Sequence, residues 1–238
     1  MAHVPRLYRP GRLEPGPLTL DAEHSRRLSA VMRLRPGEQF RLFAGDGREW
    51  SAEVDAVSGG AVHARVIEVV RQEPAPALTL ELWCALVRAN RFDLAVEKCT
   101  EAGVDVIRPL LTDHAARGDQ PSAARFQRWR RITVEATEQS GRLFVPVMAE
   151  PLTLRDALAR ARHPVVVADM TGQPWSSLAP MLPDAGPLAL AVGPEGGWSD
   201  GELATARASG ALLARINPNI LRTETAAIAL VALARSGG

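Results

Sequence analysis

From Leu78 onward, short apolar runs alternate along the chain with stretches whose apolar residues recur at helical spacing. The runs predict strands at 78–86, 104–111, 164–168, 188–192 and 211–216, and the stretches between them predict helices at 93–102, 122–140, 153–161, from 199 onward and from 223 onward. Unbroken apolar runs of this length are typical of strands that are buried on both faces of a parallel sheet. Because strands and helices alternate, the sequence predicts an α/β fold.

The predicted helices have defined ends. Ser199, with Glu202 three positions later, predicts a capping box, in which each of the two side chains binds a backbone N–H of the first turn. Thr223 is predicted to cap an alanine-rich helix that stops at Gly237. One face of the helix at 122–140 carries residues that we expect in the core, namely Phe126, Trp129, Ile132 and Ala136.

Residues 1–72 show a different pattern, in which short β-rich runs are separated by glycine turns. The predicted elements are strands at 39–44, 49–57 and 61–70 and a short helix at 21–31 capped by Asp21. Glycines between such strands are hairpin signals, so this part of the chain predicts a small β-barrel. Pro74 and Pro76 stiffen the chain that follows. We therefore expect a first domain at 1–72 and a second domain at 77–238.

Three predicted loops follow strand ends in the second domain, at 169–172, 193–197 and 216–222. Open α/β sheets bind their ligands at such ends, so we expect the three loops to converge on one ligand. The glycines of the loop at 193–197 let a ligand approach bare backbone, which suits a nucleoside. This loop lacks the glycine and lysine spacings of phosphate-binding loops. A plain turn is the other interpretation of its Gly-Pro and Gly-Gly pairs.

Four segments of the chain, in order, resemble the motifs of one enzyme family. They are Asp93–Val104, which ends as Lys-x-x-Glu-x-Gly-Val, Glu138–Arg142, which matches Glu-Gln-x-Gly-Arg, Val192–Gly197 followed by Glu202, and Ile220–Ala226. The family is that of the bacterial 16S ribosomal RNA uridine N3 methyltransferases, which is the small-subunit methyltransferase E family of SPOUT enzymes. The resemblance covers nearly the whole chain, and four ordered motifs are far more specific than one glycine loop.

The chain departs from this family at two places. Asn217 and Asn219 stand where the family usually has Gly and Arg, and of a Lys-Gly-Asp-Arg-like run upstream only Arg91 is clearly kept. Asparagine is the residue that best replaces glycine at positive φ, so we expect Asn217 to preserve the turn. The absence of the family's arginine at position 219 puts one phosphate or base contact in doubt.

The resemblance implies a fold and an activity. The expected fold is α/β, with an N-terminal PUA-like RNA-binding β-barrel and a C-terminal SPOUT methyltransferase domain that contains a trefoil knot and forms a homodimer. The expected activity is methyl transfer from S-adenosyl-L-methionine to N3 of a uridine in 16S ribosomal RNA of the small ribosomal subunit. Two alternatives stay open. One is a SPOUT methyltransferase of another RNA site, such as a ribose 2′-OH or transfer RNA, and the other is a non-catalytic RNA-binding ribosome assembly factor.

The candidate site residues form three groups. The catalytic candidates can stabilise charge on the uracil carbonyls or accept the N3 proton, and they are Glu138, Arg142, Arg222 and Glu224. An ion pair with Arg142 at the helix end is the alternative role of Glu138. The candidates for cofactor binding are Met170, Thr171, Gly193, Pro194, Glu195, Gly196, Gly197, Ile216, Asn217, Ile220 and Leu221. The RNA-binding candidates are Arg26, Arg27, Arg33, Arg35 and Arg91, for which a solvated basic face is the alternative.

Composition limits the remaining possibilities. The net charge is +1, so any basic surface for nucleic acid must be local. Cys84 and Cys99 lie in apolar segments, which favours buried reduced thiols over disulfide-bonded or metal-binding cysteines. The five histidines show no metal-ligand spacing, and no apolar run approaches transmembrane length. We therefore expect a cytoplasmic protein that uses no metal and has no membrane partner.

Overall fold

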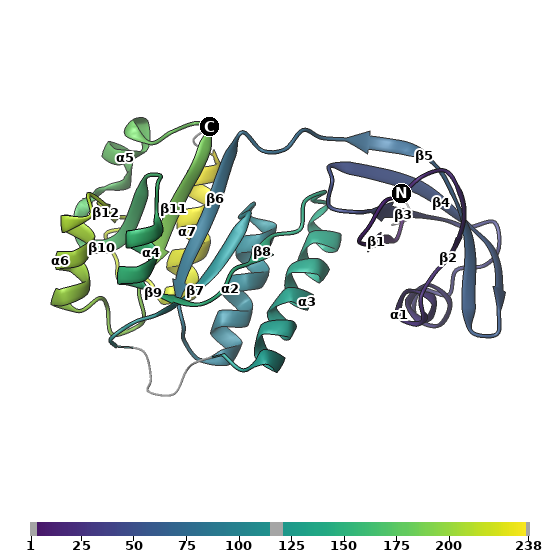
Figure 1. The fold of residues 1–238 in the computed structure, drawn as a ribbon, viewed down its shortest axis with the longest axis horizontal. Helices are drawn as coiled ribbons and strands as arrows, with labels where there is room; N and C mark the ends of the chain where they lie inside the picture. The colour runs from purple at the N-terminus through teal and green to yellow at the C-terminus, as the bar shows by residue number, and fades with distance from the viewer. Residues whose placement is uncertain (1–3, 115–120, 237–238) are drawn as a thin grey trace. The chain divides into compact units, whose positions relative to one another are not determined.

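The computed structural model describes residues 4–114 and 121–236, which form two compact units (Figure 1). The first unit comprises the described part of Met1–Ala75 together with Thr137–Phe144. The second unit comprises the described parts of Pro76–Ala136 and Val145–Gly238.

The first unit is built on a five-stranded sheet. Its strands are β1 (Arg6–Tyr8), β2 (Gly16–Thr19), β3 (Gln39–Phe43), β4 (Arg48–Ser58) and β5 (Ala61–Gln72), and their spatial order is β1-β3-β4-β5-β2. The β1–β3 pair is parallel and the other pairs are antiparallel. Gly45, Gly47, Gly59 and Gly60 have positive φ angles at the two hairpin turns. These turns confirm the predicted hairpins, because positive φ is accessible to glycine at little cost.

The predicted helix of this unit is confirmed, with a change of type along its length. Asp21 caps α1 (Ala22–Arg26), since its carboxylate accepts a hydrogen bond of 2.9 Å from the backbone N–H of His24. The chain continues as a π-helical turn, Arg27–Val31, and then enters the left-handed region at Arg33, where φ is 57°. Leu28 of this turn is buried in the core of the unit, together with Leu7, Phe40, Leu42, Trp50, Val54 and Val62.

The second unit contains a seven-stranded sheet in which every pair is parallel. Its strands are β6 (Leu78–Ala85), β7 (Val106–Leu111), β8 (Val147–Met148), β9 (Leu152–Thr153), β10 (Val165–Pro174), β11 (Gly186–Val192) and β12 (Leu212–Arg215). The order is β12-β10-β11-β6-β7-β8, and β9 pairs with β7. The predicted α/β class with a parallel sheet is therefore confirmed.

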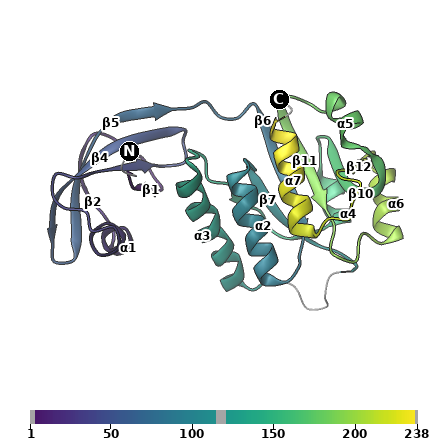
Figure 2. The same cartoon turned by 180° about the vertical axis from the view of Figure 1, so that it is seen from behind.

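Helices cover both faces of this sheet (Figure 2). They are α2 (Ala89–Glu101), α3 (Ala123–Ser140), α4 (Leu154–Arg160), α5 (Trp175–Leu178), α6 (Asp200–Ala208) and α7 (Thr223–Ser236), with a short 3-10 turn at Ala179–Met181. Alternate residues of one strand face opposite ways, so β11 packs Leu188 and Leu190 with α2 and α7 and packs Ala189 and Ala191 with α4 and α6. The unbroken apolar runs in the sequence reflect this double burial.

Most of the predicted helix features are confirmed. Ser199 and Glu202 form the complete capping box of α6. On α3, Phe126, Trp129 and Ala136 are buried, and Ile132 packs against the same core. The predicted end of the last helix at Gly237 lies outside the described residues.

We expect the two buried thiols to destabilise the folded protein at alkaline pH. Burial raises the pKa of Cys84 to about 12, with a contribution from the charge of Glu224, and burial raises the pKa of Cys99 well above its usual value of 9.0. Above pH 9 the unfolded chain therefore loses thiol protons that the folded chain retains. The free energy of unfolding should fall between about pH 9 and 12, by up to roughly 1.4 kcal/mol per pH unit for each thiol.

Urea unfolding at pH 8, 9 and 10 measures this effect. The variants Cys84→Ala and Cys99→Ala lose some stability at every pH, so the slopes against pH are compared rather than the absolute values. A shallower slope in each variant is expected, and slopes equal to that of the unchanged protein would contradict the assignment.

Candidate functional site

A cavity of about 150 Å³ in the second unit lies beside residues 168–170 of β10 and beside the carboxyl ends of its neighbours β11 and β12. The three segments predicted to converge on one ligand all contribute to its walls, so their convergence is confirmed. Nine of the residues predicted to bind a cofactor line the cavity, namely Met170, Gly193, Pro194, Glu195, Gly197, Ile216, Asn217, Ile220 and Leu221. The other two, Thr171 and Gly196, are chain neighbours of lining residues.

The segment at 169–172 is a bulge within β10 and not a loop after it, so the predicted end of this strand at Ala168 was wrong. Ala168 and Gln173 both pair with Ala214 of β12, and the four residues between them are excluded from the ladder. The Asp169 carboxylate accepts hydrogen bonds from the backbone N–H of Thr171 (2.8 Å) and from its hydroxyl (2.5 Å). A bulge of polar residues resembles a loop in the sequence, although the strand resumes after it.

Glycine at position 172 lets this bulge pack against β12. A Cβ atom there would lie 2.5 Å from both the carbonyl carbon and the carbonyl oxygen of Leu213, which are backbone atoms that cannot move aside alone. Close approach of two backbones therefore fixes the position of Asp169 and Met170 at the cavity wall.

The glycine loop at 193–197 is held on its inner side by two contacts. A Cβ atom at Gly193 would lie 3.0 Å from the ring of Trp198, whose indole N–H donates a hydrogen bond of 2.9 Å to the carbonyl of Ala168. The Thr223 hydroxyl donates a hydrogen bond of 2.9 Å to the carbonyl of Gly193. Bare backbone of this loop therefore faces the cavity while its neighbours fix its course.

Thr223 does not act as the predicted cap. It is the first helical residue of α7 and is buried, and its hydroxyl binds the carbonyl of Gly193 rather than a backbone N–H of its own helix. A threonine hydroxyl can serve either purpose, and only the approach of the glycine loop decides which.

Asn217 maintains the chain turn by a different device from the one predicted. Among the described residues other than glycine, only Arg33 has a positive φ angle, so Asn217 does not replace glycine in that conformation. Its side-chain oxygen instead accepts a hydrogen bond of 2.9 Å from the backbone N–H of Asn219. This is the local side-chain turn that asparagine commonly forms.

A charged cluster lies at the start of α7. Glu224 is only 7% exposed, and its Oε2 atom has no hydrogen-bond partner among the residues that the structure describes. Its Oε1 atom lies 3.9 Å from Nε of Arg91, and Arg91 also forms an ion pair with Glu195 of the glycine loop. Arg91, which was predicted to bind RNA, is thus in contact with two carboxylates, whereas the catalytic candidate Arg222 is exposed.

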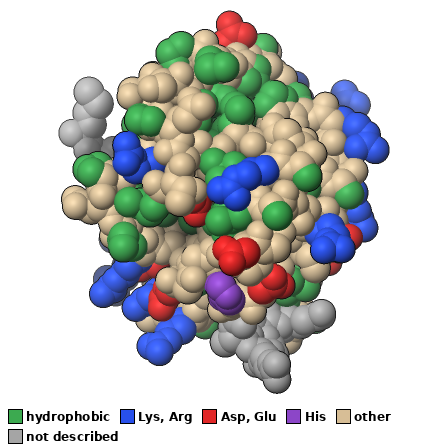
Figure 3. Space-filling model, turned by 90° about the vertical axis from the view of Figure 1, so that its left-hand side faces the viewer, with side chains coloured by type: hydrophobic (Ala, Val, Ile, Leu, Met, Phe, Trp, Pro, Cys, Tyr) green, Lys and Arg blue, Asp and Glu red, His purple; other side chains and the backbone are tan. Residues whose placement is uncertain are grey.

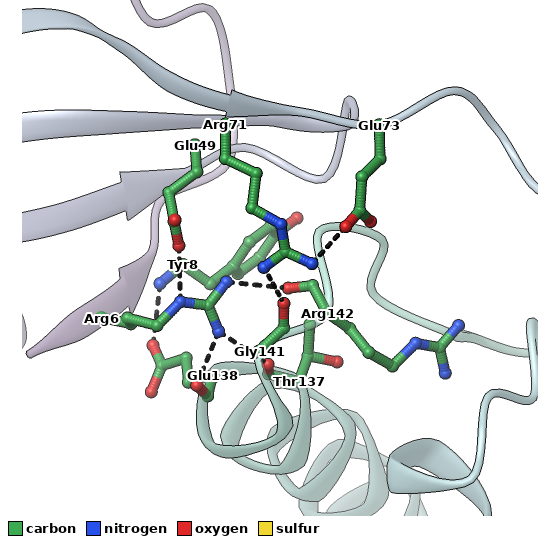
Figure 4. A network of polar contacts seen from close by, with 9 residues as sticks. All are labelled: Arg6, Tyr8, Glu49, Arg71, Glu73, Thr137, Glu138, Gly141 and Arg142. Atoms are coloured by element: carbon green, nitrogen blue, oxygen red, sulfur yellow. Dashed lines mark hydrogen bonds and ion pairs between the residues drawn. The ribbon is translucent and has the colours of Figure 1, made fainter.

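The other two catalytic candidates, Glu138 and Arg142, belong to the first unit. Figure 4 shows the polar contacts around them. The Glu138 carboxylate accepts hydrogen bonds from Arg27 (2.6 Å) and from the backbone N–H of Tyr8 (2.8 Å). The carbonyls of Glu138 and Arg142 accept hydrogen bonds from Arg6, at 2.8 and 3.1 Å. Residues of this motif therefore attach the end of α3 to β1 and the π-helical turn.

The arginines predicted to bind RNA in the first unit differ in exposure. Arg26, Arg33 and Arg35 are exposed, whereas Arg27 is partly buried and bound to Glu138. Three guanidinium groups of this cluster can therefore reach phosphates without giving up that ion pair.

Sequence reasoning did not select three residues that shape the site, Trp198, Asp113 and His114. Trp198 directly follows the glycine loop, and its large apolar side chain next to a strand end was a usable signal. Asp113 and His114 follow β7, and only the folded sheet brings them to the segment after β11. Asp113 accepts a hydrogen bond from the Ser199 hydroxyl there and donates one to Glu202.

Apolar side chains gather on the end of the second unit that carries α5 and α6 (Figure 3). In this unit, the exposed large apolar residues include two that line the cavity, Met170 at 44% and Ile220 at 87%. Exposed apolar side chains beside a cavity are typical of a ligand-binding site. Within 4–114 and 121–236, no group of three His, Cys, Asp or Glu side chains could hold a metal ion, and no helix has the length and apolar character to cross a membrane.

Comparison with protein families shows which class of protein this chain belongs to. Residues 73–235 match the model of the RNA methyltransferase domain, and residues 30–67 match that of the RNA methyltransferase PUA domain. Curated relatives identify one family within the RNA methyltransferases. A ribosomal RNA small subunit methyltransferase E of Synechocystis is 32% identical, over 91% of this chain and 72% of the relative, and that of Mycobacterium bovis is 33% identical, over 87% and 82%. The chain therefore belongs to the ribosomal RNA small subunit methyltransferase E family.

Solved structures give the same fold. A putative methyltransferase from Legionella pneumophila in complex with the cofactor SAM has a TM-score of 0.90 and 30% identity, with 99% of this chain and 98% of that chain covered. A ribosomal RNA small subunit methyltransferase E from Neisseria gonorrhoeae bound to S-adenosyl methionine has a TM-score of 0.87 and 28% identity, with 98% of each chain covered.

Proposed function

We propose that this protein transfers a methyl group from S-adenosyl-L-methionine to N3 of a uridine in 16S ribosomal RNA. One observation carries the proposal: the ends of β11 and β12 and the bulge of β10 meet at a cavity with bare glycine backbone, in a chain of the ribosomal RNA small subunit methyltransferase E family. The donor supplies a methyl group already activated on a cationic sulfonium. The protein must bind the donor, orient the acceptor and handle one proton.

The chemistry of the cavity fits this donor. Asp169 and Glu195 line the cavity, and their carboxylates suit a cation. Ile216, Ile220 and Leu221 provide apolar surface for an adenine ring. Because Gly193 has no side chain, Trp198 can close against the loop while the loop backbone remains accessible to the ligand.

Glu224 is the group that we propose as the acceptor of the uridine N3 proton. It is buried beside the cavity, between Thr223 and the other buried residues of α7, and one of its oxygens has no partner among the described residues. A buried acceptor without a partner is costly unless a bound group completes it. Arg222 is exposed on the same turn and can stabilise charge on the uracil carbonyls.

Contacts within the first unit favour a positioning role for Glu138 and Arg142. The Glu138 carboxylate already binds Arg27 and the N–H of Tyr8, whereas one oxygen of Glu224 has no partner among the described residues. We therefore propose that this motif orders the first unit and the exposed arginines near Arg27.

A uridine inside a duplex cannot be reached, so the target is an unpaired or flipped nucleotide.

The exposed arginines of the first unit are expected to contribute to RNA affinity by binding phosphates. Replacing Arg26, Arg33 and Arg35 together by Gln should weaken binding of small-subunit RNA and flatten the plot of log affinity against log salt, by about 0.7 to 0.9 for each phosphate that the variant no longer neutralises. Filter binding between about 50 and 200 mM salt measures both the affinity and the slope.

Two controls accompany the triple variant. S-adenosylmethionine affinity should not change, because the cavity is formed by the second unit alone. Replacing Arg12, Arg65 and Arg155, which are also exposed, by Gln gives a charge-matched variant that should bind RNA more like the unchanged protein. If the salt slopes of RNA binding are equal in the unchanged protein and in both triple variants, Arg26, Arg33 and Arg35 bind no phosphates and only face solvent.

The proposal includes a homodimer, a trefoil knot and a cytoplasmic location. A second copy can cover the apolar groove formed by Ile216, Leu221, Ala229, Ala232 and Leu233, and sedimentation at several protein concentrations measures this association. The return of the chain from the edge strand β12 to α7, which contacts β6 and β11, supports the knot. Ribosomal RNA as substrate supports the location.

The deciding experiment is mass spectrometry of modified nucleosides in 16S RNA from cells with and without the gene. We expect 3-methyluridine to disappear from one position when the gene is removed. A missing 2′-O-methyl nucleoside, or a modification missing from transfer RNA, would establish a SPOUT enzyme for another site. If no modification changes and calorimetry detects no binding of S-adenosylmethionine, the chain is a non-catalytic assembly factor.

A further inference from the structure

The glycine loop at 193–197 has an outer contact that comes from a strand not adjacent to its own. The loop follows β11, whereas His114 follows β7, and β6 lies between these two strands in the sheet. Nδ1 of His114 lies 3.2 Å from the carbonyl oxygen of Gly196 and 3.1 Å from that of Gly197. Carbonyl oxygens only accept hydrogen bonds, so Nδ1 must carry a hydrogen atom and donate it to this pair.

Asp113, the neighbour of His114, also connects the end of β7 to the segment that follows β11. The Asp113 carboxylate accepts a hydrogen bond of 2.5 Å from the hydroxyl of Ser199, the cap of α6. The backbone N–H of Asp113 donates a hydrogen bond of 3.2 Å to Glu202, the other member of the capping box. The start of α6 thus fixes where the chain of Asp113 and His114 lies, and His114 then contacts the loop from a fixed position.

We propose that His114 is a positioning residue that holds the glycine loop in its ligand-binding conformation. The inference rests on the proposed function, because the ligand is S-adenosylmethionine. Gly193 is fixed from the inner side by Thr223 and Trp198, and the N–H of Gly197 donates to the carbonyl of Pro194 within the loop. In the described hydrogen bonds, the carbonyls of Gly196 and Gly197 are bound only by His114. Ordering such a segment at the moment of binding reduces affinity, so a loop ordered in advance binds more tightly.

Three substitutions separate this hydrogen bond from the mere presence of a side chain. His114→Ala removes the donor. His114→Asn places an amide N–H at the same number of bonds from Cβ as Nδ1, and His114→Gln places it one bond farther away. His63→Ala is the control, because that histidine is half-buried and contacts Thr19 in the first unit, away from the glycine loop.

Calorimetry with S-adenosylmethionine tests the inference. The Ala and Gln variants should bind the donor about three- to tenfold more weakly, whereas the Asn variant and the His63 control should stay within about twofold of the unchanged protein. In methyl-transfer assays, KM for the donor should rise by the same factor while kcat at saturating donor stays nearly constant. Thermal unfolding of each variant verifies that the fold is retained.

The outcomes are distinct. If the unchanged protein binds no donor, the proposed function fails, and the inference fails with it. If the unchanged protein binds but His114→Ala binds equally well, or if His114→Asn is as weak as His114→Ala, the hydrogen bond does not position the loop and only the inference is overturned.

Discussion

Replacing Glu224 by glutamine is expected to slow methyl transfer by roughly tenfold to a thousandfold, which is the usual range for loss of a proton acceptor or of charge stabilisation. Glutamine keeps the size of the side chain and can still accept a hydrogen bond, but it cannot take up the N3 proton. Glu224 is buried with one oxygen that lacks a partner among the described residues, so the carboxylate is in place before the acceptor binds.

Donor affinity is expected to change by less than about threefold in this variant, since a neutral amide of equal volume preserves the packing of α7 against the glycine loop. Glu135→Gln is the control, because that glutamate is exposed on α3 and pairs only weakly with Arg131, at 3.8 Å. Single-turnover rates with saturating donor separate chemistry from binding. Equal losses of rate and donor affinity would mean that Glu224 shapes the site without accepting a proton.

Much of the fold could be predicted from local pattern. Strands buried on both faces leave unbroken apolar runs, and the predicted strand at 188–192 lies within the observed β11 (Gly186–Val192). The capping box at Ser199 needs only residues three positions apart, and it is present as predicted. Parallel strands also place their carboxyl ends at one edge, so three loops far apart in sequence could be assigned to one cavity.

What the sequence did not predict depends on partners from distant parts of the chain. Thr223 does not cap α7, because its hydroxyl donates a hydrogen bond to the carbonyl of Gly193, a residue 30 positions earlier in the chain. Thr137–Phe144 groups with the first unit through contacts such as Glu138 with Tyr8, which are 130 positions apart. His114 lies 82 positions from Gly196, and nothing in its own neighbourhood indicates that contact. Long-range hydrogen bonds leave no periodic pattern for sequence reasoning to use.

Arg91 links the proposed donor cavity to the proposed proton acceptor. Glu195 lines the donor cavity and pairs with Arg91, and the same guanidinium lies 3.9 Å from the proposed proton acceptor, Glu224. Arg91 therefore bridges the glycine loop and the start of α7 through these two carboxylates.

Substitution of Gly193 by valine is expected to weaken S-adenosylmethionine binding by roughly thirtyfold to a hundredfold, which corresponds to about 2 to 3 kcal/mol of overpacking. A Cβ atom at this position would already lie 3.0 to 3.2 Å from three atoms of the Trp198 ring, and the branched side chain of valine adds two more carbons. Trp198 must then move, and its hydrogen bond to the carbonyl of Ala168 breaks. Trp198 and Ala168 both line the cavity, so this movement changes the shape of its walls.

A nearby glycine provides the control for this experiment. Gly201 lies in α6, and a Cβ atom there meets only the Ser199 hydroxyl at 3.8 Å, which is ordinary contact. Gly201→Ala should leave donor affinity unchanged and stabilise the protein by up to about 0.5 to 1 kcal/mol, since alanine has a higher helix propensity than glycine. Calorimetry gives the affinities, and urea unfolding shows whether Gly193→Val remains folded. A folded Gly193→Val variant with full donor affinity would place the donor somewhere other than this cavity, because no ligand could tolerate a displaced Trp198 wall and lose nothing.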